Sequence, residues 1–82
     1  MTRDEVFEKV LSIIGPFAVN KQVLEGATEE TNILTDLKVN SARLVDIILD
    51  FEDKFDIEID DETADEIQTL GDAVEKILAI KG

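Results

Sequence analysis

The chain has 82 residues, the size of one small domain, and we expect residues 1–82 to fold as a single unit. It contains no Cys and no His, so disulfide bonds, thiolate metal sites and catalytic triads with an imidazole base are excluded. Its 20 Asp and Glu residues outnumber 8 Lys and Arg residues, and the net charge of −12 would repel nucleic acid phosphates and anionic lipids, so we expect neither as partner.

The first predicted element is a helix that begins after Thr2. Thr2 and Glu5 have the spacing of a capping box, in which each side chain accepts a hydrogen bond from the other residue's backbone N–H. Gly15 and Pro16 are expected to end the helix. Its apolar residues recur at helical spacing and are Val6, Val10, Ile13, Ile14 and Phe17.

Neither a secretory leader nor a membrane span is indicated. Asp4 and Glu5 stand where a leader would have basic residues before an apolar run. The longest stretch without a charged residue is 10–20, which is well short of the roughly 20 residues that cross a bilayer. We expect a cytoplasmic protein with no membrane insertion.

Residues 15–40 form a long connection in which no periodicity persists. Structureless loops longer than about 15 residues are uncommon in compact domains, so we expect this one to be pinned to the core and to contain a short helical turn. The predicted apolar anchors are Val19, Val23, Leu24, Ile33, Leu34, Leu37 and Val39.

A second main helix is predicted from Asn40 or Ser41, either of which can cap it, to about Phe55. Two apolar stripes separate around its axis, and one of them is sufficient to form the core. The first stripe contains Leu44, Ile47, Ile48, Phe51 and Phe55. The second contains Ala42, Val45 and Leu49, and is bordered by Asp46, Asp50 and Asp53.

After this helix we expect an extended linker that buries Ile57 and Ile59, and then a short helix over residues 61–67. Thr69 and Asp72 form a second capping box at the start of the last helix. The apolar face of that helix contains Leu70, Ala73, Val74, Ile77, Leu78 and Ile80. The predicted fold is all-α, a small four-helix bundle with three main helices, one short helix and a long connection between the first two.

Residues 50–66 concentrate the negative charge, with ten Asp and Glu residues and one Lys. A calcium loop that began at Asp56 would have Asp61 in place of its Gly and Ile67 in place of its last Glu, so we expect no metal site. The acidic stretch is interpreted as a solvated face or as a docking surface for basic partners. A hydrolase that uses paired carboxylates would need aromatic platforms, but the chain has no Trp or Tyr, and we expect no enzyme.

Ser41 is the remaining candidate for chemistry, although a Ser at a helix start is by itself usually a capping residue. The chain has Asp36-Leu37, a short turn, Asn40-Ser41, a helix that ends in Phe51-Glu52-Asp53-Lys54-Phe55, and then Ile57-Glu58-Ile59. This order of elements, with this length and acidity, resembles the acyl carrier protein family. The resemblance implies that Ser41 carries 4′-phosphopantetheine, whose thiol holds acyl groups as thioesters. It also implies a monomer whose partners are a phosphopantetheinyl transferase and acyl-loading, acyl-processing or acyltransferase enzymes.

Two groups of residues are expected to serve this role. Partner enzymes are predicted to dock on Asn40, Ala42, Arg43, Val45, Asp46, Leu49, Asp50 and Asp53. An acyl chain is predicted to lie among Leu44, Ile48, Phe51, Ile59 and Leu70, for which ordinary core packing is an equally good interpretation.

The attachment motif differs from the family's usual pattern. Carriers of fatty acid synthesis typically have Asp-Ser-Leu where this chain has Asn40-Ser41-Ala42, a Gly-rich turn where it has Lys38-Val39, and an acidic or polar residue where it has Arg43. We therefore expect a specialised carrier of fatty acid, lipid or secondary-metabolite biosynthesis. The alternatives are an unmodified acidic interaction module with the same fold, and an aminoacyl or peptidyl carrier.

Overall fold

The computed structural model describes residues 2–81, and this part of the chain is helical, with one isolated β-bridge between Asn32 and Thr69. The predicted all-α bundle is confirmed, and α2 is the short helical turn expected within the connection. The helices are α1 (Arg3–Ile14), α2 (Lys21–Glu25), α3 (Leu44–Phe55), α4 (Asp61–Asp65) and α5 (Leu70–Lys81), with 3₁₀ turns η1 (Gly15–Phe17) and η2 (Ser41–Arg43). None of the helices in residues 2–81 is long and apolar enough to cross a bilayer.

The helix α1 begins and ends where the sequence predicts. The Thr2 hydroxyl accepts the Glu5 backbone N–H at 3.2 Å, and the Glu5 carboxylate accepts the Thr2 N–H at 3.2 Å, so the capping box is confirmed. The Thr2 backbone N–H and hydroxyl both donate to the Glu5 carboxylate, and these two hydrogen bonds lower the pKa of Glu5. The helix stops at Ile14, and Pro16 lies in the η1 turn that follows.

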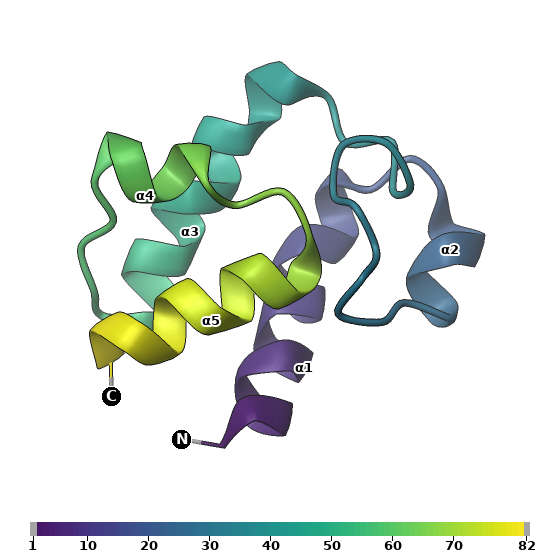
Figure 1. Cartoon of the computed structure of the whole chain (residues 1–82). Coiled ribbons are helices and arrows are strands. Elements are labelled where there is room, and N and C mark those ends of the chain that lie inside the picture. The colour runs from purple at the N-terminus through teal and green to yellow at the C-terminus, as the bar shows by residue number, and fades with distance from the viewer. Residues whose placement is uncertain (1, 82) are drawn as a thin grey trace.

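The core lies where α1 packs against both α3 and α5 (Figure 1). Phe51 and Phe55 of α3 meet edge to face, with ring centroids 6.4 Å apart. Burial of each large apolar side chain stabilises the fold by about 1.5–3 kcal/mol. The residues with no exposed surface in these helices are Val6, Val10, Ile14, Ile47, Phe51, Leu70, Ala73, Val74 and Ile77. Ile80 does not join them: it is 43% exposed in the last turn of α5, where the bundle is open to solvent.

The long connection is pinned to the core as predicted. Ile33 and Leu37 have no exposed surface, and Val39 is buried. The prediction that Val19 is an anchor is wrong, because its side chain is 74% exposed. The extended backbone at Ala18 turns that small side chain into the core and the next one outward.

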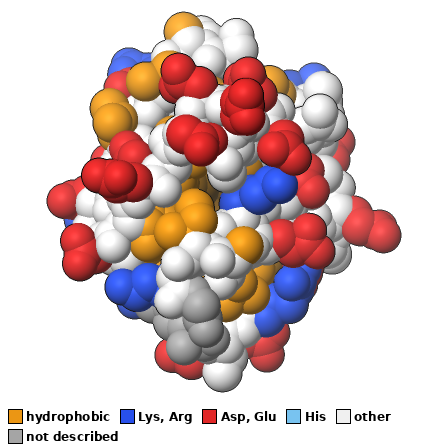
Figure 2. Space-filling model, turned by 60° about the vertical axis from the view of Figure 1, so that its left-hand side comes forward, with side chains coloured by type: hydrophobic (Ala, Val, Ile, Leu, Met, Phe, Trp, Pro, Cys, Tyr) orange, Lys and Arg blue, Asp and Glu red, His pale blue; other side chains and the backbone are white. Residues whose placement is uncertain are grey.

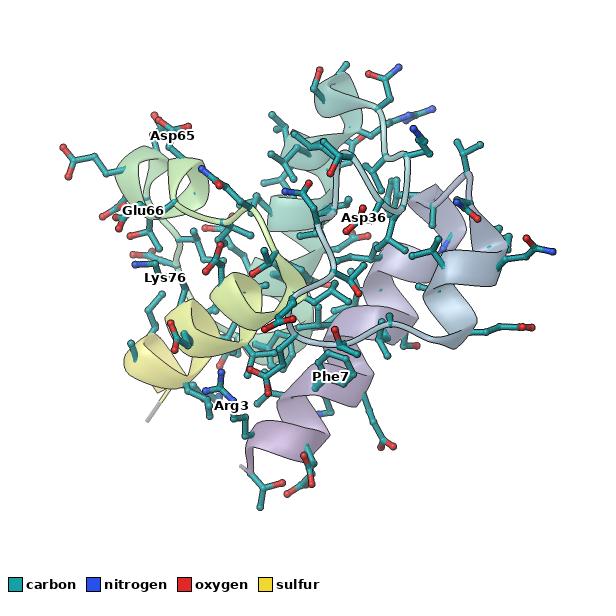
Figure 3. All side chains as sticks on the ribbon, turned by 45° about the vertical axis from the view of Figure 1, so that its right-hand side comes forward. Arg3, Phe7, Asp36, Asp65, Glu66 and Lys76 are labelled. Atoms are coloured by element: carbon teal, nitrogen blue, oxygen red, sulfur yellow. The ribbon has the colours of Figure 1, made fainter. Side chains whose placement is uncertain are left out.

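A second set of backbone contacts ties the connection to the start of α5. Ile33 N donates to Gln68 O at 2.9 Å, and Gly71 N donates to Glu29 O at 2.8 Å. The Arg3 side chain extends from α1 toward α5 (Figure 3), and its Nε lies 2.9 and 2.8 Å from the two carboxylate oxygens of Glu29. The Arg3 guanidinium lowers the pKa of the Glu29 carboxyl. One loop residue therefore joins α1, the connection and α5.

Hydrogen bonds also fix the short helix and the start of α5. The Thr69 backbone N–H donates to the Asp72 carboxylate and the Asp72 N–H donates to the Thr69 hydroxyl, each at 3.1 Å, so the second capping box is confirmed. The hydrogen bond from the Thr69 N–H lowers the pKa of Asp72. The side chain of Asp60 caps α4 by accepting the Thr63 N–H at 2.8 Å. Lys76 of α5 meets Glu66, which follows α4, at 3.1 Å (Figure 3).

The linker between α3 and α4 is extended, and Ile59 is buried while Ile57 is half-buried. Asp56 ends α3 in the left-handed conformation, with φ of 55°. The Glu52 carboxylate accepts the Ile59 backbone N–H at 2.8 Å. This bond holds the linker against the last turns of α3, and thereby sets where α4 begins.

We expect Gly71→Ala to lower the free energy of unfolding by about 1–3 kcal/mol through overpacking. A Cβ at this position would lie 2.8 Å from the Glu29 carbonyl oxygen and 2.9 Å from the Glu29 Cβ. Gly26→Ala is the matched control, because a Cβ there meets nothing within 4 Å. Urea unfolding measures both variants, and equal midpoints would contradict the prediction.

Candidate functional site

Ser41 lies at the first position of η2, and its neighbour Asn40 caps the turn. The Asn40 side-chain oxygen accepts the Ala42 backbone N–H at 2.8 Å, and the Asn40 carbonyl accepts the Arg43 N–H at 2.8 Å. Of the two capping candidates in the sequence, the structure therefore uses Asn40. Ser41 is exposed, and within residues 2–81 its hydroxyl makes no hydrogen bond. The hydroxyl is available to another molecule.

The electrostatic field at Ser41 comes from the helix that follows it. The η2 turn runs directly into α3, and the aligned peptide dipoles give the start of a helix a partial positive charge. The N–H groups of Ala42 and Arg43 are already bound to Asn40, so free donors are not the source of this field. An anionic substituent on the Ser41 oxygen would be stabilised by the dipoles.

The turn before Ser41 is fixed by Asp36 and Leu37. The Asp36 carboxylate accepts the Asn32 backbone N–H at 2.8 Å, and this closes the turn on the connection (Figure 3). Leu37 is fully buried and anchors the segment. Lys38 then adopts the left-handed conformation, with φ of 58°. The Asp-Leu pair thus positions the serine through a closed turn and a buried side chain.

The outer stripe of α3 remains exposed. Val45 is 65% and Leu49 55% exposed, and Ala42 is also exposed. Among the acids beside the stripe, Asp50 and Asp53 are exposed. Asp46 forms an ion pair with Arg43 at 3.1 Å, so the charges of these two side chains compensate each other. Figure 2, which brings α4 forward, shows hydrophobic side chains in a hollow among Asp and Glu side chains.

A cavity of about 300 Å³ lies between α3 and α4, with Ser41 in its lining. Three of the predicted acyl-chain residues line it: Leu44, Ile48 and Ile59. The other two do not, because Phe51 and Leu70 have no exposed surface and belong to the core.

The sequence did not indicate that Val45, Leu49 and Ala64 would also line the cavity. The spacing of Ser41, Val45 and Leu49, four residues apart, could have shown that they share a helix face. The predicted docking stripe is therefore continuous with the cavity.

Three carboxylates, those of Glu52, Asp61 and Asp65, complete the cavity lining, and no Lys or Arg contributes to the lining among the described residues. In residues 2–81 no three acidic side chains come together as metal ligands would. The cavity thus combines apolar walls with an acidic border, which favours an uncharged apolar occupant.

Residues 19–77 match the family model described as the phosphopantetheine attachment site. The chain belongs to the acyl carrier protein family. It is 41% identical to the acyl carrier protein of Lactobacillus acidophilus over the whole of both chains, and 39% identical to that of Thermotoga maritima over 93% of this chain and 91% of that one. A solved structure of the acyl carrier protein from Enterococcus faecalis has a TM-score of 0.78 at 38% identity, covering 96% of this chain and 98% of the other.

Members of the acyl carrier protein family are carriers without catalytic activity, and their prosthetic group is 4′-phosphopantetheine. The residues present fit this group. A phosphodiester needs an accessible hydroxyl and favours the start of a helix, and Ser41 provides both. Transferases that attach the group and acyl-handling enzymes are the general partners of the family.

We expect Lys38→Gly to raise the free energy of unfolding by roughly 1 kcal/mol, because a side chain is disfavoured in the left-handed conformation and Gly is not. Lys38→Ala removes the same charge but keeps a Cβ, so it should give no comparable gain. Urea unfolding compares the two variants. An equal gain in both would attribute the effect to the lost charge instead of the backbone.

Proposed function

We propose that this chain is a specialised acyl carrier protein, a cytoplasmic monomer that carries acyl groups on 4′-phosphopantetheine attached to Ser41. When bound, the group supplies a flexible arm whose terminal thiol holds acyl groups as thioesters. The observation that carries the proposal lies at the start of η2. Asn40 caps the turn, and the Ser41 hydroxyl is left exposed and without a hydrogen bond in the described residues.

The choice of Ser41 has further support in the sequence and the surface. It is the single serine within residues 19–77, the segment that matches the family model. It lies at an exposed junction of connection and helix, which a transferase and several later enzymes can reach. It also borders the cavity between α3 and α4, so a carried chain has an apolar surface beside its point of attachment.

The exposed stripe of α3 is the proposed docking face for these enzymes. Val45 and Leu49 offer apolar contact, and Asp50 and Asp53 offer negative charge that attracts a basic partner mainly through a faster association. Asp46 contributes less, because the Arg43 guanidinium already neutralises it.

The proposed specialisation is supported by Asn40. The cap needs one side-chain oxygen, which an Asp would supply equally well, so the fold gives no reason for the uncharged amide. The missing charge lies beside the hydroxyl, where modifying enzymes approach. We therefore assign the carrier to a dedicated fatty acid, lipid or secondary-metabolite pathway, with a matched transferase and matched acyl-loading enzymes.

Incubation with coenzyme A and a phosphopantetheinyl transferase should add one phosphopantetheine to the protein, as measured by intact mass. Ser41→Ala should abolish the gain, whereas Ser12→Ala, which alters the other serine of the chain, should not. A wild-type protein that stays unmodified while a control carrier is labelled would leave an acidic interaction module as the better interpretation.

Loading the arm with an octanoyl group should raise the melting temperature by about 5–10 °C. Each buried CH₂ gains about 0.8 kcal/mol, and a half-open cavity realises part of this. Ala64→Leu fills the cavity and should reduce the rise, whereas Ala79→Leu on the exposed side of α5 should not. Calorimetry of bare and loaded protein tests this, and an unchanged melting temperature would exclude sequestration.

A further inference from the structure

The segments of the connection that lead into Ser41 are the least acidic part of this chain. This sector, residues 15–24 and 33–40, contains two cations, Lys21 and Lys38, and one acid, Asp36, and so carries a net charge of +1 in a chain of −12. Arg43 is not counted, because it is paired with Asp46. The other residues therefore carry −13. An acidic group on a partner is repelled by most of the surface and is repelled least at this sector.

Two backbone hydrogen bonds join the segments of this sector. Val19 N and Asn20 N both donate to the Leu37 carbonyl at 3.1 Å. Val19 has the most exposed large apolar side chain among the described residues, at 74%, and its backbone is bonded to the residue directly before the exposed Lys38. Figure 1 shows η2 between the connection on one side and α3 on the other. Val19 and Lys38 thus both belong to the connection that leads into η2, whereas the exposed acids Asp50 and Asp53 belong to α3.

The structure gives Lys38 no internal role for its ammonium group. Arg3, Arg43 and Lys76 pair with carboxylates, but within residues 2–81 Lys38 forms no ion pair. Its backbone is left-handed, with φ of 58°, a conformation that Gly adopts with less strain. Strain of this kind is commonly retained where the side chain acts on another molecule.

We propose that Val19 and Lys38 form a second docking surface that receives an acidic side chain next to an apolar one on the phosphopantetheinyl transferase. This inference rests on the proposed function. The transferase must reach the Ser41 oxygen itself, only three residues after Lys38, whereas later enzymes meet the thiol at the far end of a flexible arm. The partner therefore presents both signs of charge, basic toward α3 and acidic toward the connection.

The test uses the full chain and the transferase from the same cell, with kcat/KM for attachment measured at about 0.05 M and about 0.5 M salt. Lys38→Glu should lower kcat/KM about tenfold at low salt, and Lys38→Asn, which tolerates the left-handed backbone, about threefold. Both losses should shrink at high salt. Val19→Ser should lower kcat/KM about threefold at either salt concentration.

Lys54→Glu is the matched control. It makes the same change in net charge in the last turn of α3, 13 residues from Ser41 and so about 20 Å along the helix. It should change kcat/KM less than twofold. Lys38→Gly separates folding from contact, because it should stabilise the fold and still slow attachment.

The possible outcomes distinguish the two proposals. A wild-type protein that the transferase leaves bare overturns the proposed function and this inference with it. If the wild type is modified but Lys38→Glu and Lys38→Gly are no slower than Lys54→Glu, the second docking surface is wrong and the carrier function stands. Losses of equal size at both salt concentrations for Lys38→Glu would also contradict a charge contact.

Discussion

The hydrogen bond from the Ala42 N–H to the Asn40 side chain is the interaction on which the functional end of this molecule depends. A turn that opens a helix needs an acceptor for its first N–H groups, and serine commonly supplies one. Here the preceding residue does so, and the serine hydroxyl points to no internal partner among the described residues. Leu37 directly precedes the Lys38–Val39 turn and is fully buried, so it anchors this arrangement to the core.

The elements that the sequence predicted correctly depend on neighbours a few residues apart. Both capping boxes, and the buried faces of α1, α3 and α5, follow from spacings of three and four residues. Val19 could not be placed in this way, because its exposure depends on the pairing of its backbone with the distant Leu37. Periodicity also shows which side of a helix faces inward but not where packing leaves space. Periodicity alone could therefore not predict that Phe51 lies in the core while Val45 lines the cavity.

The carboxylates divide into those that build the fold and those that cover it. The pKa values of Glu5, Glu29, Asp60 and Asp72 are lowered, because each accepts hydrogen bonds in the folded state. Their stabilisation is complete above the ordinary pKa, 4.5 for Glu and 3.8 for Asp, and is lost as the pH falls through the lowered pKa. Glu52 and Glu66 also build the fold, through the Ile59 N–H and Lys76. The remaining acids of residues 50–66 repel one another at neutral pH, and we expect them to serve by attracting basic partners.

The close approach of Gly71 to Glu29 also limits how this sequence can diverge. Every other amino acid would bring a side-chain carbon into the loop backbone, so a substitution of Gly71 is disfavoured unless the loop itself moves. Gly26 has open space around it, and that position can vary freely. Two glycines that look alike in the sequence thus differ in evolutionary freedom, and the difference arises from how near one loop passes to the first turn of the last helix.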